Sequence, residues 1–411
     1  MRAGLLGARL GYSYSPQIHA FFGDYSYDLF EVAPEKLDSF MRGGSFDALN
    51  VTIPYKRAVM PYCAQLTDAA RAIGSVNTIV RRADGTLLGD NTDAAGFTAM
   101  LRRLSVDPAG KKALVLGSGG ASLTVRHVLA TLGAREVVVI SRSGENNYQN
   151  LDRHADAEIL VNATPVGMFP NCGVSPVDLK TLPRLSAVLD IIYNPARTQL
   201  LTDASALGIP CIGGLTMLVE QARAAAERFL GTPVSEALAR KAYAAVLRDT
   251  QNIVLIGMPG CGKSTLAAVL ARLTGREAAD ADALIARECG MPIPEYFASH
   301  SEGEFRAVET RVLAQLCSRS SLVIATGGGC VTRPENRDIL RQNGRVFYIH
   351  RDLKLLDTSG RPLSQAASLE EMFARRAPLY RAFADAEIEN AGTVEDAAAR
   401  IWEVFNEIAC D

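Results

Sequence analysis

Twice along this chain of 411 residues, a short β-branched run leads directly into a glycine-rich loop and then into a helical pattern. The first such unit spans residues 114–122 (LVLGSGGAS), and the second spans residues 253–265 (IVLIGMPGCGKST). Glycine lets the backbone approach a phosphate closely, and the start of the helix supplies free amide donors. Two such units predict two α/β parts, which agrees with a length of two or three domains at roughly 150 residues each.

The alternation of apolar runs and helical patterns continues along the chain and predicts parallel sheets of the α/β class. The expected buried strands are residues 113–116, 137–140, 159–161, 188–191, 253–256, 322–325 and 346–349. An Ala-rich helix is expected from about Met217 to Val246, just before the second glycine loop. We expect a two-lobed N-terminal half that contains a Rossmann-type lobe, followed by a P-loop domain with an α/β/α parallel sheet.

The composition excludes several classes of partner. Lys and Arg number 43 against 45 Asp and Glu, a net charge of −2, so no basic field indicates nucleic acid or an anionic membrane. No apolar run is long enough to cross a bilayer, and the start MRAGLLGARLGYS has no signal-peptide pattern. The 8 cysteines include no CxxC pair, which is typical of a reducing compartment. We therefore expect a cytoplasmic protein, as a monomer or a homodimer.

The first glycine loop has the features of a dinucleotide site, although three glycines alone also fit a simple tight turn. The expected contacts to the cofactor come from Gly117, Ser118, Gly119, Gly120 and Ala121. After the next strand, an NAD site usually has an acidic residue for the ribose hydroxyls, but this chain has Arg142. Because arginine suits a 2′-phosphate, the sequence favours NADP(H) over NAD.

The second glycine loop fits the pattern GxxxxGK[ST], which binds the phosphates of a nucleoside triphosphate through backbone amides. Lys263 would reach the β- and γ-phosphate oxygens, and the Ser264 hydroxyl would ligate Mg²⁺. The residues expected to contact ATP are Gly260, Cys261, Gly262, Lys263, Ser264 and Thr265. The second half is therefore predicted to bind ATP with Mg²⁺.

Ordered polar motifs surround the first loop. They are residues 13–16 (SYSP), 50–56 (NVTIPYK), 74–78 (GSVNT), 89–93 (GDNTD), 162–168 (NATPVGM), 190–195 (DIIYNP) and 213–221 (GGLTMLVEQ). In order and spelling they resemble shikimate dehydrogenase, and this resemblance extends to about residue 245. It implies a substrate lobe of residues 1–95 plus about 222–248 and an NADP-binding lobe of residues 96–221, together forming a domain of residues 1–248.

The resemblance also implies roles for individual residues. Ser13 and Ser15 would hold the substrate carboxylate, while Ile191 and Gly214 would border the cofactor. The residues implied around the ring hydroxyls are Thr52, Asn77, Asp93, Tyr193 and Gln221. Lys56 and Asp93 would be the catalytic pair, because ketone reduction needs a proton for the developing alkoxide. Without this context, Lys56 would be a surface lysine and Asp93 the N-cap of a helix over residues 94–101.

The motifs after the second loop are residues 280–282 (DAD), 302–309 (EGEFRAVE), 325–329 (ATGGG), 361–363 (RPL) and 376–380 (RAPLY). They resemble shikimate kinase and place this domain at residues 249–411. The implied substrate contacts are Asp282, Arg306, Gly328 and Arg376, with Asp282 also helping to activate the attacking oxygen. Asp280 would support the Mg²⁺ shell, and Arg361 would neutralise charge on the transferring phosphoryl group.

The leading hypothesis is a bifunctional enzyme that reduces 3-dehydroshikimate to shikimate and then phosphorylates the product. In one alternative the kinase half only binds nucleotide and shikimate, because the segment between Arg351 and Arg361 is short. A second alternative is a quinate/shikimate dehydrogenase. A nucleotide-controlled regulator of proteins or DNA is a third, but the basic recognition helix or exposed apolar interface that it needs is not evident.

Overall fold

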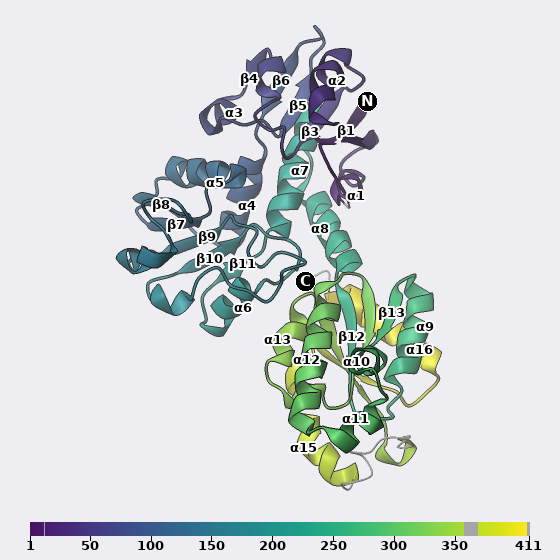
Figure 1. Ribbon diagram of the computed structural model, residues 1–411. Coiled ribbons are helices and arrows are strands. Elements are labelled where there is room, and N and C mark those ends of the chain that lie inside the picture. The colour runs from purple at the N-terminus through teal and green to yellow at the C-terminus, as the bar shows by residue number, and fades with distance from the viewer. Residues whose placement is uncertain (12, 357–368, 409–411) are drawn as a thin grey trace. The chain divides into compact units, whose positions relative to one another are not determined.

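The computed structural model describes residues 1–11, 13–356 and 369–408 (Figure 1). Two compact units divide the chain. Unit 1 consists of Met1–Met168, Val174–Tyr193 and Thr198–Val246, and unit 2 consists of Phe169–Gly173, Asn194–Arg197 and Leu247–Asp411. Among the described residues, none of the helices combines the length and the apolar character that a membrane crossing requires.

The N-terminal part of unit 1 contains a six-stranded mixed sheet in the order β2-β1-β3-β5-β6-β4. Its strands are β1 (Arg2–Gly7), β2 (Ser26–Glu31), β3 (Ala48–Val51), β4 (Gln65–Leu66), β5 (Thr78–Arg81) and β6 (Leu87–Asp90). The short helices α1 (Ser15–His19), α2 (Leu37–Gly43) and α3 (Asp68–Ile73) connect them. β5 runs antiparallel to β3 and β6, so the start of β5 lies beside the end of β6.

The second sheet of unit 1 is five-stranded and parallel, in the order β11-β10-β9-β7-β8. Its strands are β7 (Lys112–Leu116), β8 (Glu136–Ile140), β9 (Ile159–Asn162), β10 (Ala187–Asp190) and β11 (Cys211–Ile212). The helices α4 (Asp93–Arg103), α5 (Gly120–Thr131) and α6 (Gln199–Ala206) belong to the same part. This order reverses between β7 and β9, which is where doubly wound sheets bind ligands. The predicted Rossmann-type lobe is confirmed.

The Ala-rich segment after the second sheet is not one helix. The structure has α7 (Leu215–Leu230) and α8 (Glu236–Thr250), so the single helix predicted over residues 217–246 is wrong. Gly231 ends α7 in the left-handed conformation at φ 68°, with its amide bonded to the Glu227 carbonyl. Pro233 follows two residues later and cannot continue the helical hydrogen bonding.

Unit 2 contains a five-stranded parallel sheet in the order β13-β14-β12-β15-β16. Its strands are β12 (Asn252–Ile256), β13 (Glu277–Asp280), β14 (Leu322–Ala325), β15 (Gly344–His350) and β16 (Ala386–Glu389). Its helices are α9 (Lys263–Thr274), α10 (Ala281–Cys289), α11 (Ile293–Ser299), α12 (Glu302–Ser318), α13 (Asn336–Arg341), α15 (Leu369–Phe383) and α16 (Val394–Ile408). Val254 packs into one apolar cluster and its neighbour Leu255 into another, so β12 is buried on both faces. The expected P-loop sheet is confirmed.

Candidate active sites

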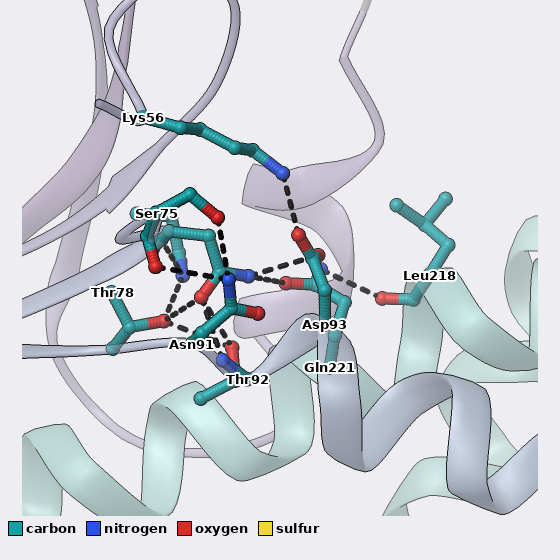
Figure 2. Close-up of polar contacts among 10 residues, drawn as sticks. Lys56, Ser75, Thr78, Asn91, Thr92, Asp93, Leu218 and Gln221 are labelled. Carbon is teal, nitrogen blue, oxygen red and sulfur yellow. Dashed lines mark hydrogen bonds and ion pairs between the residues drawn. The ribbon is translucent and has the colours of Figure 1, made fainter. Parts of the chain in front are cut away.

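A lysine–carboxylate pair lies in unit 1, where Lys56 Nζ is 2.6 Å from Asp93 Oδ2 (Figure 2). The Lys56 side chain is 29% exposed and that of Asp93 is 13% exposed, so the pair is shielded but still reachable. Asp93 is the first residue of α4, and Thr92 occupies the N-cap position. The interpretation of Asp93 as a helix N-cap is therefore wrong, and its carboxylate faces the lysine.

Asn77 holds the other oxygen of that carboxylate. Its Nδ2 donates to Asp93 Oδ1 at 2.9 Å and to Gln221 Oε1 at 3.4 Å. Its Oδ1 accepts from the Thr92 amide at 2.7 Å and from the Thr78 hydroxyl at 3.0 Å. The Asn77 amide is therefore fixed in one orientation, and each Asp93 oxygen has its own partner.

These groups border a pocket of about 240 Å³. The predicted residues that line it are Ser13, Ser15, Thr52, Lys56, Asn77, Asp93, Ile191, Tyr193, Gly214 and Gln221. The sequence analysis missed Asn50, whose Oδ1 accepts from the Tyr27 hydroxyl at 2.7 Å. Asn50 opens the polar motif of residues 50–56, so the signal was present and was not used. The structure thus brings every predicted substrate residue of unit 1 to one pocket.

The first glycine loop leaves open space at the start of α5. Gly117 has φ 96°, and a Cβ there would lie 2.8 Å from Thr164 Cγ2. A Cβ at Gly119 or Gly120 would meet no heavy atom within 4 Å, so the backbone at the helix start is open on that side. Ser118 and Ala121 belong to the same loop, and Arg142 is exposed just after β8. Free amides at a helix of 12 residues and a nearby exposed guanidinium fit the phosphates of NADP.

A buried carboxyl group joins the loops at the end of this sheet. Asp190, fully buried at the end of β10, accepts hydrogen bonds from the Ile192 amide and Asn162 Nδ2, both at 3.1 Å. Its second oxygen accepts from the Thr198 hydroxyl at 2.7 Å, and that hydroxyl also caps α6. Burial raises the pKa of Asp190 from 3.8 to about 6, although the three hydrogen bonds act in the opposite direction.

This raised pKa predicts a pH-dependent stability. Below about pH 4 the carboxyl is protonated in both the folded and the unfolded protein, so its burial costs no stability through ionisation. As the pH rises from 4 to 6, the unfolded carboxyl ionises while the buried one stays protonated, so the folded protein loses stability until the buried group also ionises at about pH 6. Asp190→Asn keeps the shape without titrating. We expect its stability relative to wild type to increase by about 3 kcal/mol between pH 4 and pH 7.5. Hydrogen exchange of β10 amides in both proteins at each pH measures this difference, with the exposed Asp152→Asn as the control. A pH-independent difference would rule the prediction out.

The P-loop lysine of unit 2 is held by the loop itself. Lys263 Nζ donates to the Gly257 and Met258 carbonyls at 2.9 Å each, and the side chain is buried. Gly260 and Gly262 have φ values of 81° and 95°, a conformation that favours glycine. Lys263 and the loop amides therefore surround a position that fits phosphate oxygens.

A hydroxyl and a carboxylate lie next to this loop in the arrangement expected for Mg²⁺. Ser264 Oγ donates to Asp280 Oδ2 at 2.6 Å, and Asp280 Oδ1 accepts from the Ala283 amide at 3.2 Å. Asp280 thus caps α10 and presents its other oxygen to Ser264. Oxygen ligands of these types suit Mg²⁺.

A cavity of about 640 Å³ extends from the P-loop. The predicted residues that line it are Gly260, Gly262, Lys263, Ser264, Thr265, Asp282, Arg306, Gly328 and Arg376. Asp280 and Cys261 are not among its lining residues, and Cys261 is fully buried in the core. Arg361 lies outside the described residues. The structure thus places all but three of the predicted residues of this half on one cavity.

An ion pair that the sequence analysis did not assign lies on the wall of this cavity. Arg306 donates to Glu309 Oε2 at 2.8 Å and to Glu302 Oε1 at 3.1 Å. Glu309 is fully buried, and burial raises its pKa, while the neighbouring Arg306 opposes that shift. Both glutamates belong to the motif of residues 302–309, but the spacing alone did not show which one faces the arginine inside the core.

Two of the three glycines after β14 lie directly against the charged side chains of this wall. A Cβ at Gly329 would lie 2.0 Å from Arg306 Nη2, and a Cβ at Gly327 would lie 2.7 Å from Asp282 Oδ1 and also from Glu309 Oε1. The Gly328 carbonyl accepts from Arg376 Nη1 at 3.3 Å and from the Tyr380 hydroxyl at 2.5 Å. A side chain at Gly327 or Gly329 would therefore displace these charged groups from their positions in the cavity.

Comparisons with known proteins match the N-terminal and the C-terminal part of the chain to two different families. Residues 5–79 match the family model of the shikimate dehydrogenase substrate binding domain, and residues 259–406 match that of shikimate kinase. A shikimate dehydrogenase (NADP(+)) of Synechocystis is 36% identical over 271 residues, which cover 58% of this chain and 93% of that protein.

Two solved structures resemble unit 1. The chorismate mutase/shikimate 5-dehydrogenase fusion protein from Clostridium acetobutylicum aligns with a TM-score of 0.56 and 35% identity, covering 59% of this chain and 96% of that one. The shikimate 5-dehydrogenase of Thermus thermophilus, solved in complex with NADP(H) and shikimate, gives a TM-score of 0.53 and 31% identity, covering 59% and 99% of the two chains.

Proposed function

Since this chain belongs to the shikimate dehydrogenase family and continues into a shikimate kinase domain, we propose that it catalyses two consecutive reactions. It reduces 3-dehydroshikimate to shikimate with NADPH, and it then phosphorylates the 3-hydroxyl of shikimate with ATP. The observation that carries this proposal is the presence of two pockets, one with the Lys56–Asp93 pair and one with the P-loop lysine.

In unit 1, Lys56 is the proton donor. Bound NADPH supplies a hydride to the carbonyl carbon, and the oxygen of that carbonyl then develops negative charge. The Lys56 ammonium stabilises this oxygen and donates a proton to it, while Asp93 holds the lysine in place at 2.6 Å. Asn77 fixes the second Asp93 oxygen, so the carboxylate cannot rotate away from the lysine.

The remaining polar groups of the pocket orient the substrate. Ser13 and Ser15 bind its carboxylate, and the groups assigned to its ring hydroxyls are Thr52, Asn77, Tyr193 and Gln221. The loop from Gly117 to Ala121 would hold NADP(H), and Ile191 and Gly214, which line the substrate pocket, would border the cofactor. The exposed Arg142 binds the 2′-phosphate and favours NADP over NAD.

In unit 2, the chain's own charges position the two reactants. Arg306 and Arg376 bind the shikimate carboxylate, and Asp282 accepts the proton of the attacking hydroxyl. Lys263 moves from its carbonyl contacts to the phosphate oxygens of ATP. Mg²⁺ at Ser264 and Asp280 neutralises phosphate charge when bound. Arg361, which lies outside the described residues, would contact the transferring phosphoryl group.

The close approach of Gly327 to Asp282 gives a prediction for the kinase reaction. Gly327→Ala places a methyl group 2.7 Å from Asp282 Oδ1, so that carboxylate must move from its position in the cavity. We expect kcat/KM for shikimate phosphorylation to fall at least about 10-fold, because small misplacements of reacting groups are costly. Gly303→Ala is the matched control, since the nearest atom to its new Cβ would be 3.9 Å away. Unchanged phosphorylation by Gly327→Ala would contradict the placement of Asp282.

Separate assays of the two half-reactions test the proposed function. The purified chain should oxidise NADPH with 3-dehydroshikimate and should release ADP from Mg-ATP with shikimate. Substituting NADH for NADPH tests the assignment of Arg142, and substituting quinate for shikimate in the reverse reaction tests the substrate class. A chain that binds Mg-ATP and releases no ADP would show that the kinase half is only a binding module.

A further inference from the structure

Arg351 lies at the carboxyl end of β15, immediately beside the P-loop. β15 pairs in parallel with β12, which leads into that loop, in a register that places Tyr348 opposite Ile256. The contact continues past the strands, because a Cβ at Gly257 would lie only 2.2 Å from the Ile349 carbonyl oxygen. Arg351 follows two residues later and lines the same cavity as Lys263.

Arg351 differs from Arg306 in its charge partners. Arg306 is paired with two carboxylates, Glu309 and Glu302. Arg351 makes no ion pair with any of the residues that the structure describes, and its Nε is buried without a hydrogen-bond partner among them. A buried donor on a charged group is costly unless an acceptor reaches it. An anionic ligand in the cavity would supply that acceptor.

The position of Arg351 in the sheet indicates which anion this is. The proposed shikimate-binding groups Asp282 and Gly328 follow β13 and β14, which lie on one side of β12. Arg351 follows β15, which lies on the other side of β12, and the end of β15 contacts the start of the P-loop. We propose that Arg351 binds the phosphate groups of the nucleotide, as a second cation beside Lys263. This inference rests on the proposed nucleotide site of unit 2.

The place of Arg351 in the fold determines how its side chain reaches the phosphates. Arg351 directly follows β15, so its guanidinium approaches the phosphates from the edge of the sheet. A planar guanidinium can make two parallel hydrogen bonds to a phosphate, which a lysine cannot reproduce. Nucleotide affinity should therefore depend on Arg351 itself, and Arg351→Lys should retain the charge but only part of the affinity.

The experiment uses the full chain with Mg-ADP as the probe, measured by titration calorimetry, together with KM values in the kinase assay without NADP. For Arg351→Gln we expect the Kd for Mg-ADP and the KM for ATP to rise about 10- to 100-fold. The KM for shikimate should stay within about twofold of wild type, and Arg351→Lys should give intermediate values. The exposed Arg375→Gln on α15 is the matched control and should change none of these constants. A KM for shikimate close to that of wild type shows that unit 2 of each variant is folded, because the proposed shikimate-binding groups belong to that unit.

Several outcomes would overturn the inference. A raised KM for shikimate with an unchanged Kd for Mg-ADP would assign Arg351 to the substrate carboxylate. If Arg351→Gln changes none of these constants, or if the wild-type chain does not bind Mg-ADP, then Arg351 does not bind the nucleotide phosphates. A wild-type chain that binds Mg-ADP but does not phosphorylate shikimate would contradict the proposed function alone, and the affinity for Mg-ADP would still decide the role of Arg351.

Discussion

Lys56→Met is expected to lower kcat for reduction of 3-dehydroshikimate by about 10³-fold and to leave phosphorylation of shikimate unchanged. Methionine keeps most of the aliphatic stem but removes the ammonium group that contacts Asp93 at 2.6 Å. The developing alkoxide then loses both its proton donor and the nearest positive charge, and losses of roughly 10²- to 10⁴-fold are typical for such groups. NADPH oxidation, followed by its absorbance, measures the effect.

The neighbouring exposed Arg57 provides the control for this variant. Arg57→Met also removes one positive charge, but it lies outside the pocket lining and should retain the wild-type rate. If Lys56→Met keeps more than about a tenth of the wild-type kcat, Lys56 is not the proton donor. An equal loss in the Arg57 variant would indicate that net charge, and not the pocket, determines the rate.

Lys263→Met is expected to have the reciprocal effect, a loss of about 10³-fold in the kinase reaction with normal reduction of 3-dehydroshikimate. Lys263 is the P-loop cation, and its Nζ now contacts two backbone carbonyls, which shows that the amine is held inside the loop. Removing it takes away a preorganised charge at the phosphates, where such groups contribute most to catalysis. ADP release in the presence of shikimate measures the loss.

Arg272, which is exposed on the same helix α9, is the control for the P-loop variant. Arg272→Met should phosphorylate shikimate at the wild-type rate. Substantial kinase activity in Lys263→Met would contradict the assignment of the P-loop lysine. A parallel loss of dehydrogenase activity would show that the substitution acts through folding and not through the nucleotide site.

Much of the fold followed from local patterns. The strands β7, β8, β9, β10, β12, β14 and β15 are short apolar runs, and both glycine loops follow such a run, so these strands and loops were predicted. The strands of the six-stranded sheet, together with β11, β13 and β16, were not predicted. The break between α7 and α8 was missed because the alanines on both sides favour helix, although Gly231 and Pro233 were present as a stop signal. The residue limits proposed for the domains and lobes remain predictions.

The sequence indicated many residues of the pockets but not the contacts that hold them in place. Motif spelling led to residues such as Lys56 and Arg306, but the partners that hold them come from distant segments. Asn77 is 144 positions before Gln221, and no local pattern indicates that their side chains meet. Arg351 was noticed only as the start of a short segment, because a guanidinium inside a cavity is indistinguishable from a surface charge in the sequence.

The most direct test of the account supplies the intact chain with 3-dehydroshikimate, NADPH and Mg-ATP together, and follows both cofactors. The account predicts that NADPH is oxidised, that ADP appears after it in an equal amount, and that shikimate 3-phosphate is the final product. Lys263→Met should stop at shikimate, and Lys56→Met should consume neither cofactor. Oxidation of NADPH by the wild-type chain with accumulation of shikimate and no release of ADP would contradict the claim that one chain carries both activities.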